Sequence, residues 1–154
     1  MTGIILHLTI FIFNFSSQQG HNYHAFRINQ MMNHSDIDIS REFLALGAEI
    51  IVISGRLAKS SLYRPVINQL LRSGTSAGAN YEEACGAQSK ADFIHKLHIC
   101  FKELKETAYW LHLIKKSGIV KENELYSAMS KSQMLLNIIG KSLITCKKNL
   151  KDEV

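Results

Sequence analysis

The chain has 154 residues, a length that fits one domain with a hydrophobic core of its own. Hydrophobic residues make up 46% and charged residues 20%, as in ordinary globular proteins, and one proline with nine glycines favours long helices over sheets. Three cysteines without a Cys-x-x-Cys pair argue against a structural zinc site and for a reducing, cytoplasmic environment. The net charge of +5 is compatible with a nucleic-acid partner but does not require one.

The first 35 residues combine an apolar run with residues 16–35, which are rich in Asn, His, Gln and Ser and show no helical period. The apolar run GIILHLTIFIFNF at residues 3–15 is too short for a bilayer-spanning helix, which needs about 20 residues. No basic residues precede it, as they would in a secretory signal. We therefore predict a non-conforming or disordered extension over residues 1–35, a folded domain over residues 36–150 and no membrane partner. A membrane or partner tether is the alternative interpretation of the extension.

The first predicted helix covers residues 40–59 and is capped by Asp38 or Ser40. Apolar side chains recur at spacings of three and four, which is typical of a helix seam that faces a core. These seam residues are Phe43, Leu46, Ile50, Ile53 and Leu57. Three further apolar residues, Leu44, Ile51 and Val52, are expected to widen the seam.

The second predicted helix covers residues 64–87, with Pro65 in its first turn, where proline is tolerated. Its middle is unusually small-sided because Gly74, Ala77 and Gly78 follow one another closely. A glycine inside a helix costs roughly 0.5–1 kcal/mol relative to alanine. We therefore expect a neighbouring helix to approach closely at this point.

Two further helices are predicted over residues 90–117 and 121–147. Ser89 is the expected cap of the first, and Gly118 its expected terminus. This helix has a main apolar stripe (Phe93, Leu97, Cys100, Leu104, Leu111) and a second one (Ile94, Phe101, Ala108). The last helix turns Leu125, Met129, Leu135, Ile138, Ile139 and Leu143 inward and its lysines outward. The sequence thus predicts an all-α protein, an antiparallel up-down-up-down four-helix bundle.

Polar residues form stripes along the second and third helices. On the second helix the stripe is Arg72, Ser76, Asn80 and Glu83, and on the third it is Lys96, Glu103, Glu106 and Trp110. If the two helices fold back antiparallel near residues 87–88, Arg72 reaches Glu103 and Glu106, and Glu83 reaches Lys96. A buried charge without a partner is very costly. Because opposite charges of the two helices lie at the same positions along the contact, we predict a buried ionic network that holds the helices together.

The same stretch carries a resemblance to a known family. Its pattern is Arg-Ser-x-x-Ser-x-x-x-Asn-x-x-Glu-Ala, a short gap with Ser or Lys, Asp-Phe-x-x-Lys-Leu and Glu-x-x-Glu-Thr-x-x-Trp-Leu. The positions here are Arg72, Ser73, Ser76, Asn80, Glu83, Ala84, Lys90, Asp92, Phe93, Lys96, Leu97, Glu103, Glu106, Thr107, Trp110 and Leu111. In these residues the chain resembles the small bundle proteins named for intervening sequences in bacterial large-subunit (23S) ribosomal RNA genes.

The resemblance implies a four-helix bundle that assembles into a ring-shaped homopentamer, in a group whose members mostly have no assigned activity. The accessory protein of diversity-generating retroelements looks like a relative. We therefore expect a non-catalytic, nucleic-acid (RNA)-binding or scaffold oligomer, with RNA, DNA or a reverse transcriptase as candidate partners. A protein-interaction module without a nucleic-acid partner is the alternative.

No motif for catalysis, cofactor or metal stands out. A di-iron bundle needs Glu-x-x-His pairs, and neither Glu103 nor Glu106 begins one. His95 and His98 could share an ion, but no third ligand is evident. The serines near residue 73 lack a hydrolase elbow or a phosphate-binding loop. We predict no enzyme activity, no cofactor and no metal.

The basic residues are the candidate nucleic-acid site. Residues 115–154 hold eight lysines against four acids. The lysines near the ends of the last helix, namely Lys115, Lys116, Lys121, Lys147 and Lys148, are the predicted phosphate contacts. Because these two groups lie at opposite ends of one helix, at most one of them can line a given face of a ring.

Overall fold

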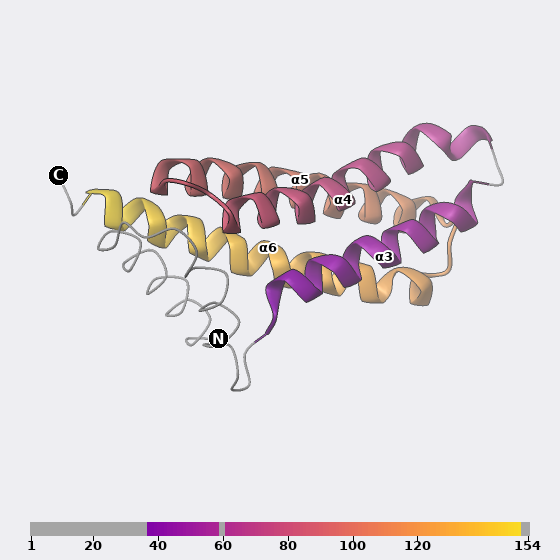
Figure 1. Cartoon of the computed structure of the whole chain (residues 1–154). Coiled ribbons are helices and arrows are strands. Elements are labelled where there is room, and N and C mark those ends of the chain that lie inside the picture. Colours follow the sequence, from indigo (N-terminus) through magenta and orange to yellow (C-terminus); the bar gives the residue numbers. More distant parts are fainter. Residues whose placement is uncertain (1–36, 59–60, 152–154) are drawn as a thin grey trace.

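The computed structural model describes residues 37–58 and 61–151, with side chains as far as residue 146. The extension predicted for residues 1–35 lies outside the described residues. Within them the chain is all-α, without a strand. The helices are α3 (Ile39–Leu57), α4 (Arg64–Cys85), α5 (Lys90–Ser117) and α6 (Glu122–Lys151), with a short 3₁₀ turn η1 (Ser61–Tyr63) before α4 (Figure 1).

Local sequence signals set most of the helix ends. The Asp38 carboxylate accepts a hydrogen bond from the Arg41 backbone N–H at 3.1 Å, and the Ser89 hydroxyl accepts one from the Asp92 N–H at 3.1 Å. Gly118 ends α5 in the left-handed conformation (φ 68°), which glycine adopts without steric cost. The predicted caps are therefore confirmed, with Asp38 and not Ser40 capping α3.

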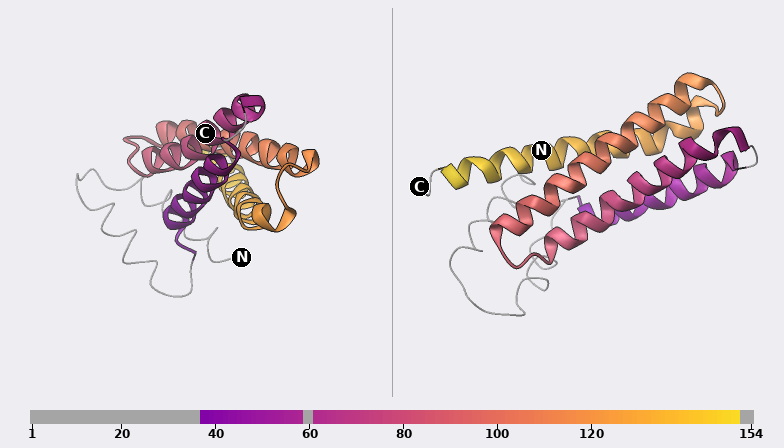
Figure 2. Two further views of the ribbon diagram at one scale, coloured as in Figure 1. Left: turned by 90° about the vertical axis from the view of Figure 1, so that its right-hand side faces the viewer. Right: turned by 90° about the horizontal axis from the view of Figure 1, so that it is seen from above.

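Contacts between helices show how they are arranged. α3 packs against α4 and α6, and α5 packs against the same two helices, so α3 and α5 occupy opposite corners. Ion pairs and close contacts show that neighbouring helices run antiparallel. On α4 and α5, for example, Arg72 pairs with Glu103, whereas the later residue Glu83 pairs with the earlier residue Lys96. Figure 2 shows the turn between α4 and α5 at one end of the molecule and the turn between α5 and α6 at the other.

The core lies between the four helices and follows the predicted seams. All five seam residues of α3 are buried, as are Phe93, Leu97, Cys100, Leu104 and Leu111 on α5. The prediction that three further residues widen the α3 seam is wrong: Leu44, Ile51 and Val52 are 75%, 56% and 53% exposed. A helix with two neighbours buries only the arc between them, and these three side chains lie on the opposite arc.

The close approach predicted for α4 is made by α3. A Cβ added to Gly74 would overlap with Cδ1 of Ile50 and lie 3.3 Å from its Cγ1 and Cγ2. One turn further along α4, a Cβ on Gly78 would lie 3.4 Å from Cβ of Phe43, whose ring stacks on Tyr81 with centroids 4.9 Å apart. The small residues of α4 thus make room for large side chains of α3.

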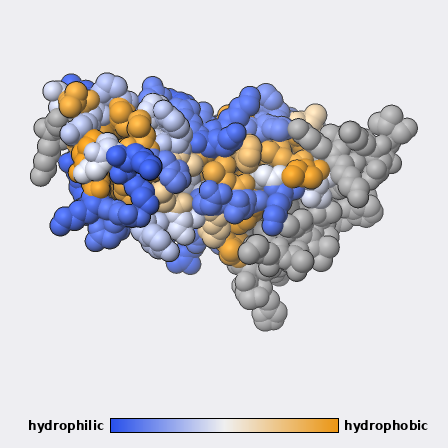
Figure 3. All heavy atoms as spheres, turned by 180° about the vertical axis from the view of Figure 1, so that it is seen from behind, coloured by the Kyte–Doolittle hydropathy of each residue, from blue (hydrophilic) through white to orange (hydrophobic). Residues whose placement is uncertain are grey.

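The surface is mixed in character. Figure 3, a view from behind, shows hydrophobic side chains interleaved with hydrophilic ones over that face. Among the helices in the described ranges, none is both long and apolar enough to span a bilayer.

Candidate functional site

Arg72 is the centre of a polar cluster that links α4 to α5. Its Nη1 donates to both carboxylate oxygens of Glu103 at 3.1 Å, its Nη2 donates to Glu106, and its Nε donates to Gln69 of α4 at 3.1 Å. The guanidinium thus has partners for each of its three nitrogens. This fixes the long side chain in one orientation and ties two helices together at a defined height.

Trp110 completes this cluster one turn along α5. Its indole Nε1 donates to Oε1 of Glu106 at 3.1 Å. The hydrogen bond from Arg72, and after it the one from Trp110, holds the pKa of Glu106 below its ordinary value. The exposed ring of Tyr109 meets Trp110 edge to face at a centroid distance of 4.9 Å. Glu106 is therefore a carboxylate at neutral pH.

The other end of the α4–α5 contact holds a second set of polar side chains. Lys96 of α5 forms an ion pair with Glu83 of α4, and this hydrogen bond is the main cause that raises the pKa of Lys96. Asn80 instead bonds within its own helix, donating to the Ser76 carbonyl at 2.9 Å and to the Ser76 hydroxyl at 3.2 Å.

The expectation of a buried network needs correction. The side chains of Arg72, Glu103 and Glu106 are 48%, 16% and 33% exposed, and that of Glu83 is 55% exposed. The polar stripe of α4 lies beside the buried stripe formed by Leu70, Ser73, Ala77, Tyr81 and Ala84, and not within it. These residues therefore form a polar seam along the outer edge of the α4–α5 contact.

A buried polar contact lies between α4 and α5 on the core side of the polar seam, and it was not predicted from the sequence. The hydroxyls of Ser73 and Thr107 lie 3.1 Å apart, and both side chains are fully buried. The single proton of the Thr107 hydroxyl can go either to Ser73 or to the Glu103 carbonyl, which lies 2.8 Å away, while the Ser73 hydroxyl has the Leu70 carbonyl as its own acceptor at 3.3 Å. Both residues belong to the family pattern, and their positions on the core stripes of α4 and α5 were the available signal.

The five predicted lysines fall into two groups. Lys115 forms an ion pair with Glu122 across the α5–α6 turn, while Lys116 and Lys121 are exposed. Lys147 and Lys148 lie in the last turns of α6, and their side chains are outside the described part. From Lys121 to Lys147 the chain rises roughly 40 Å along the helix, so the two groups lie at opposite ends.

Arg64 adds a charge to the first group that the sequence did not single out. It begins α4, at the end of the bundle where α5 turns into α6, and its side chain is exposed. Arg56 of α3 is at the same end but bonds to Glu124 at 2.8 Å. Arg64, Lys116 and Lys121 have no ion pair within the described ranges; we call these three the basic end.

Metal-binding clusters and the cysteines are the remaining candidates for chemistry. Across residues 37–58 and 61–151, no three His, Cys, Asp or Glu side chains gather as a metal site would require. Burial raises the pKa of Cys85 and of Cys146 to about 11, and it also raises that of Cys100. These thiols are therefore protonated at neutral pH, and the thiolate is the form that reacts.

Comparison with known proteins agrees with the family pattern. The sequence profile of the 23S rRNA-intervening sequence proteins matches residues 35–141. The chain belongs to this family.

A solved structure of the S23 ribosomal protein family has the same fold. This protein of unknown function from Bacteroides thetaiotaomicron VPI-5482 is 35% identical and superposes with a TM-score of 0.62 over 66% of this chain and 94% of its own. No curated protein matches the chain. Membership in the 23S rRNA-intervening sequence family thus identifies the fold without assigning an activity.

Proposed function

We propose that the protein is a non-catalytic, cytoplasmic scaffold that binds RNA through phosphates, as a ring-shaped homopentamer of up-down-up-down bundles. The single observation that carries the RNA-binding part is the basic end: three exposed cations, from two helices and a turn, lie at the same end of the bundle. The antiparallel contacts of each neighbouring pair of helices support the order of the bundle. The family pattern supports the ring.

The ion pairs around the basic end show which cations are available. Lys115 and Arg56 are held by Glu122 and Glu124, whereas Arg64, Lys116 and Lys121 remain exposed. A phosphate oxygen can replace the water around an exposed ammonium or guanidinium without breaking a protein ion pair. We therefore assign the phosphate contact to the basic end and not to Lys115.

Assembly would multiply this charge. Each subunit of a ring adds another copy of the three cations, and a long polyanion can contact several copies at once. Because phosphates are alike in every sequence, such binding carries little base preference. Binding of this kind suits a scaffold that accompanies an RNA or a reverse transcriptase. The accessory protein of diversity-generating retroelements, the relative that the resemblance implies, would act in the same way.

A gel-shift titration of a structured RNA at rising salt tests the proposal. We compare the wild type with K116E/K121E at the basic end and with K102E/K105E, a charge-matched control on the exposed middle of α5. Loss of phosphate contacts should lower the affinity of K116E/K121E by about 10-fold or more and flatten its salt dependence, since each contact contributes a slope of about one. The control should bind nearly as the wild type does.

A third variant, K147E/K148E, asks whether the far end of α6 matters instead. A large loss there, with little loss in K116E/K121E, would move the site to the C-terminal lysines. Equal losses in all three variants would mean that only net charge counts. No binding even at low salt would contradict RNA binding and favour a protein-interaction module.

A further inference from the structure

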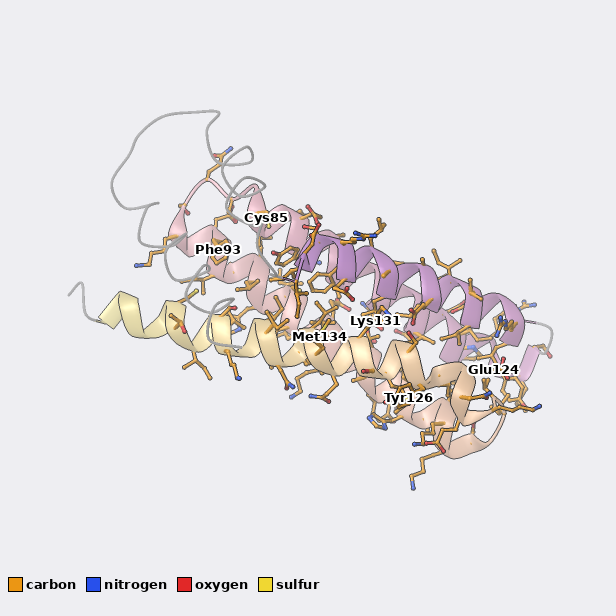
Figure 4. All side chains as sticks on the ribbon, turned by 90° about the horizontal axis from the view of Figure 1, so that it is seen from below. Cys85, Phe93, Glu124, Tyr126, Lys131 and Met134 are labelled. Atoms are coloured by element: carbon orange, nitrogen blue, oxygen red, sulfur yellow. The ribbon has the colours of Figure 1, made fainter. Side chains whose placement is uncertain are left out.

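A groove runs along the outer side of α6, and residues of α5 and α6 line it. It has a volume of about 720 Å³. Among the described residues, its central lining on α6 carries no charge: Tyr126, Met129, Gln133, Met134, Asn137 and Ile138. The charged lining residues lie toward the ends, where Lys115 pairs with Glu122 at one end and Lys141 lies at the other. We call this surface the α6 groove; Figure 4 labels Tyr126 and Met134 on it.

The lining of the α6 groove favours an apolar occupant. Met129, Met134 and Ile138 pack against the core but are only partly buried. Gln133 donates to Asn137 at 3.1 Å, so covering these two amides costs less than covering two unbonded ones. Methionines adapt their shape to incoming apolar side chains. Since an engineered cavity of about 150 Å³ holds a benzene ring, the groove has room for roughly four such rings.

The described chain begins at this groove. Ile37 is the first residue that the structure describes, and its side chain is one of those that line the groove. Because α3 runs antiparallel to α6, Ile37 lies toward the Lys141 end. Residues 1–36 therefore connect to the bundle at one end of the α6 groove.

The chain ahead of Ile37 contains an apolar run that suits such a groove. Residues 3–15 hold nine Ile, Leu or Phe side chains, and the first charged residue of the chain is Arg27. The run lies outside residues 35–141, which match the family. Burying such side chains is favourable, and an uncharged lining lets this happen without taking an ionised group out of water.

The residues between the run and the bundle are numerous enough for the run to reach the groove. Residues 16–36 make this connection. A chain of about 20 residues spans at most roughly 70 Å, with a typical end-to-end distance of roughly 25 Å. The uncharged lining from Tyr126 to Ile138 extends only about 18 Å along α6. A connection of this length also keeps the run at a local concentration near the millimolar range.

We infer that the apolar run of residues 3–15 packs into the α6 groove of its own chain. The exposed face of α3 that carries Leu44, Ile51 and Val52 belongs to one helix and contacts an incoming segment from one side, whereas the groove contacts it from two helices. The N-terminal run thereby covers a surface that another apolar partner would otherwise use. The inference goes beyond the proposed RNA contact, since the basic end and the groove lining share no residue.

Methionine methyl NMR on the full chain tests the inference, because Met129 and Met134 line the groove. Met129→Leu and Met134→Leu assign the two signals, and a soluble paramagnetic probe broadens the signals of uncovered methyl groups. Both signals should be protected in the wild type. Phe11→Glu places a charge in the run and should abolish the protection. Tyr23→Glu, the matched control, places the same charge on an aromatic residue outside the run and should leave the protection intact.

Tyr126→Glu changes the groove instead of the run, and Tyr109→Glu is its matched control. The two tyrosines are 72% and 59% exposed, but only Tyr126 lines the groove. Y126E should lose the protection of the two methionine methyl groups, and Y109E should keep it. Circular dichroism should show the same helix content in both variants, since neither tyrosine is part of the core.

Mixing chains shows which copy supplies the run. Methyl-labelled F11E is unfolded and refolded together with an excess of unlabelled wild type. If each run occupies the groove of its own chain, the labelled methyl groups stay unprotected in the mixture. Restored protection would assign the run to the groove of a second copy and overturn the inference.

Other outcomes also overturn the inference and point elsewhere. Equal broadening in wild type and F11E would show that the run does not cover the groove. Equal loss of protection in F11E and Y23E would mean that any added charge in residues 1–36 has this effect. Sedimentation of the wild type, but not of F11E, with phosphatidylcholine vesicles, together with unprotected methionine signals, would assign the run to a lipid bilayer.

Discussion

The two long contacts of α4 are built in different ways. Against α3, α4 presents Gly74 and Gly78, and the space they leave is filled by Ile50 and Phe43. Against α5, it presents a buried hydroxyl on Ser73 and a row of polar residues at the outer edge. One helix therefore packs by shape on one side and by hydrogen bonds and ion pairs on the other.

The two contacts therefore contribute in different ways: the contact with α3 mainly stabilises the fold, and the contact with α5 mainly sets how the two helices are aligned. Close apolar packing contributes more stability per contact, and it responds steeply to a change of one methyl group. Exposed ion pairs contribute little energy, but they favour one height of α5 along α4 over others, because a shift by one turn would separate the charges. Three predictions test this comparison.

The largest effect is expected where shape decides. Gly74→Ala places a methyl group on Cδ1 of Ile50, which is fully buried, and should lower the free energy of unfolding by about 1–3 kcal/mol. Ile50→Val removes that Cδ1. In the I50V background the same Gly74→Ala change should cost much less, and the double-mutant cycle in urea measures this coupling.

Gly47→Ala is the control for this cycle, because a Cβ on Gly47 of α3 meets nothing within 4 Å. It should raise the free energy of unfolding by about 0.5–1 kcal/mol through helix propensity alone. All variants are compared at one protomer concentration, since assembly shifts the apparent stability. Equal effects of alanine at residues 47 and 74 would contradict the close contact between α3 and α4.

A smaller effect is expected for the buried hydrogen bond on the other side of α4. Thr107→Val keeps the shape of the side chain but removes the hydroxyl that meets Ser73, and should cost about 1 kcal/mol. Thr75→Val removes an exposed hydroxyl that bonds only within α4, and should change stability by less than about 0.5 kcal/mol. Identical urea midpoints for the two variants would show that the Ser73–Thr107 contact adds no stability.

The smallest effect is expected in the exposed seam, and it depends on pH. The pKa of Glu106 is lowered in the folded protein, chiefly by the hydrogen bond from Arg72. A lowered pKa means that the stabilisation is fully present above the unfolded-state value of about 4.3 and is lost as the pH falls through the lower folded value. Glu106→Gln should therefore cost less than about 1 kcal/mol at neutral pH.

Urea unfolding of wild type and E106Q at pH 7, 5, 4 and 3 measures this dependence. The difference between them should be constant at the higher pH values and shrink at the lowest two. A difference that persists at acid pH would have a cause other than the carboxylate charge, such as a changed contact with Trp110.

Much of the fold could be predicted because it is local. The caps at Asp38 and Ser89, the terminus at Gly118 and the spacing of the core seams depend on residues within a turn or two of each other. Helix geometry also predicts which charged residues of α4 and α5 face each other when the two helices run antiparallel. The structure contains the predicted Arg72–Glu103 and Glu83–Lys96 pairs.

Which side of each helix is covered could not be predicted, because that depends on the neighbours. The sequence does not say which arc of α3 its neighbours cover, so Leu44, Ile51 and Val52 looked like core although they are exposed. The polar seam looked buried for the same reason. Likewise, only the structure showed that Glu122 pairs with Lys115 and that Arg64 lies at the same end of the bundle as Lys116 and Lys121.

The sequence by itself therefore determined the family, the four helices and the main apolar stripe of each helix, because helical periodicity and capping act over short distances. The tertiary structure alone decided which apolar surfaces remain open and which charges remain unpaired. Both depend on packing between helices that are far apart in the chain, and both proposals made for this protein rest on them.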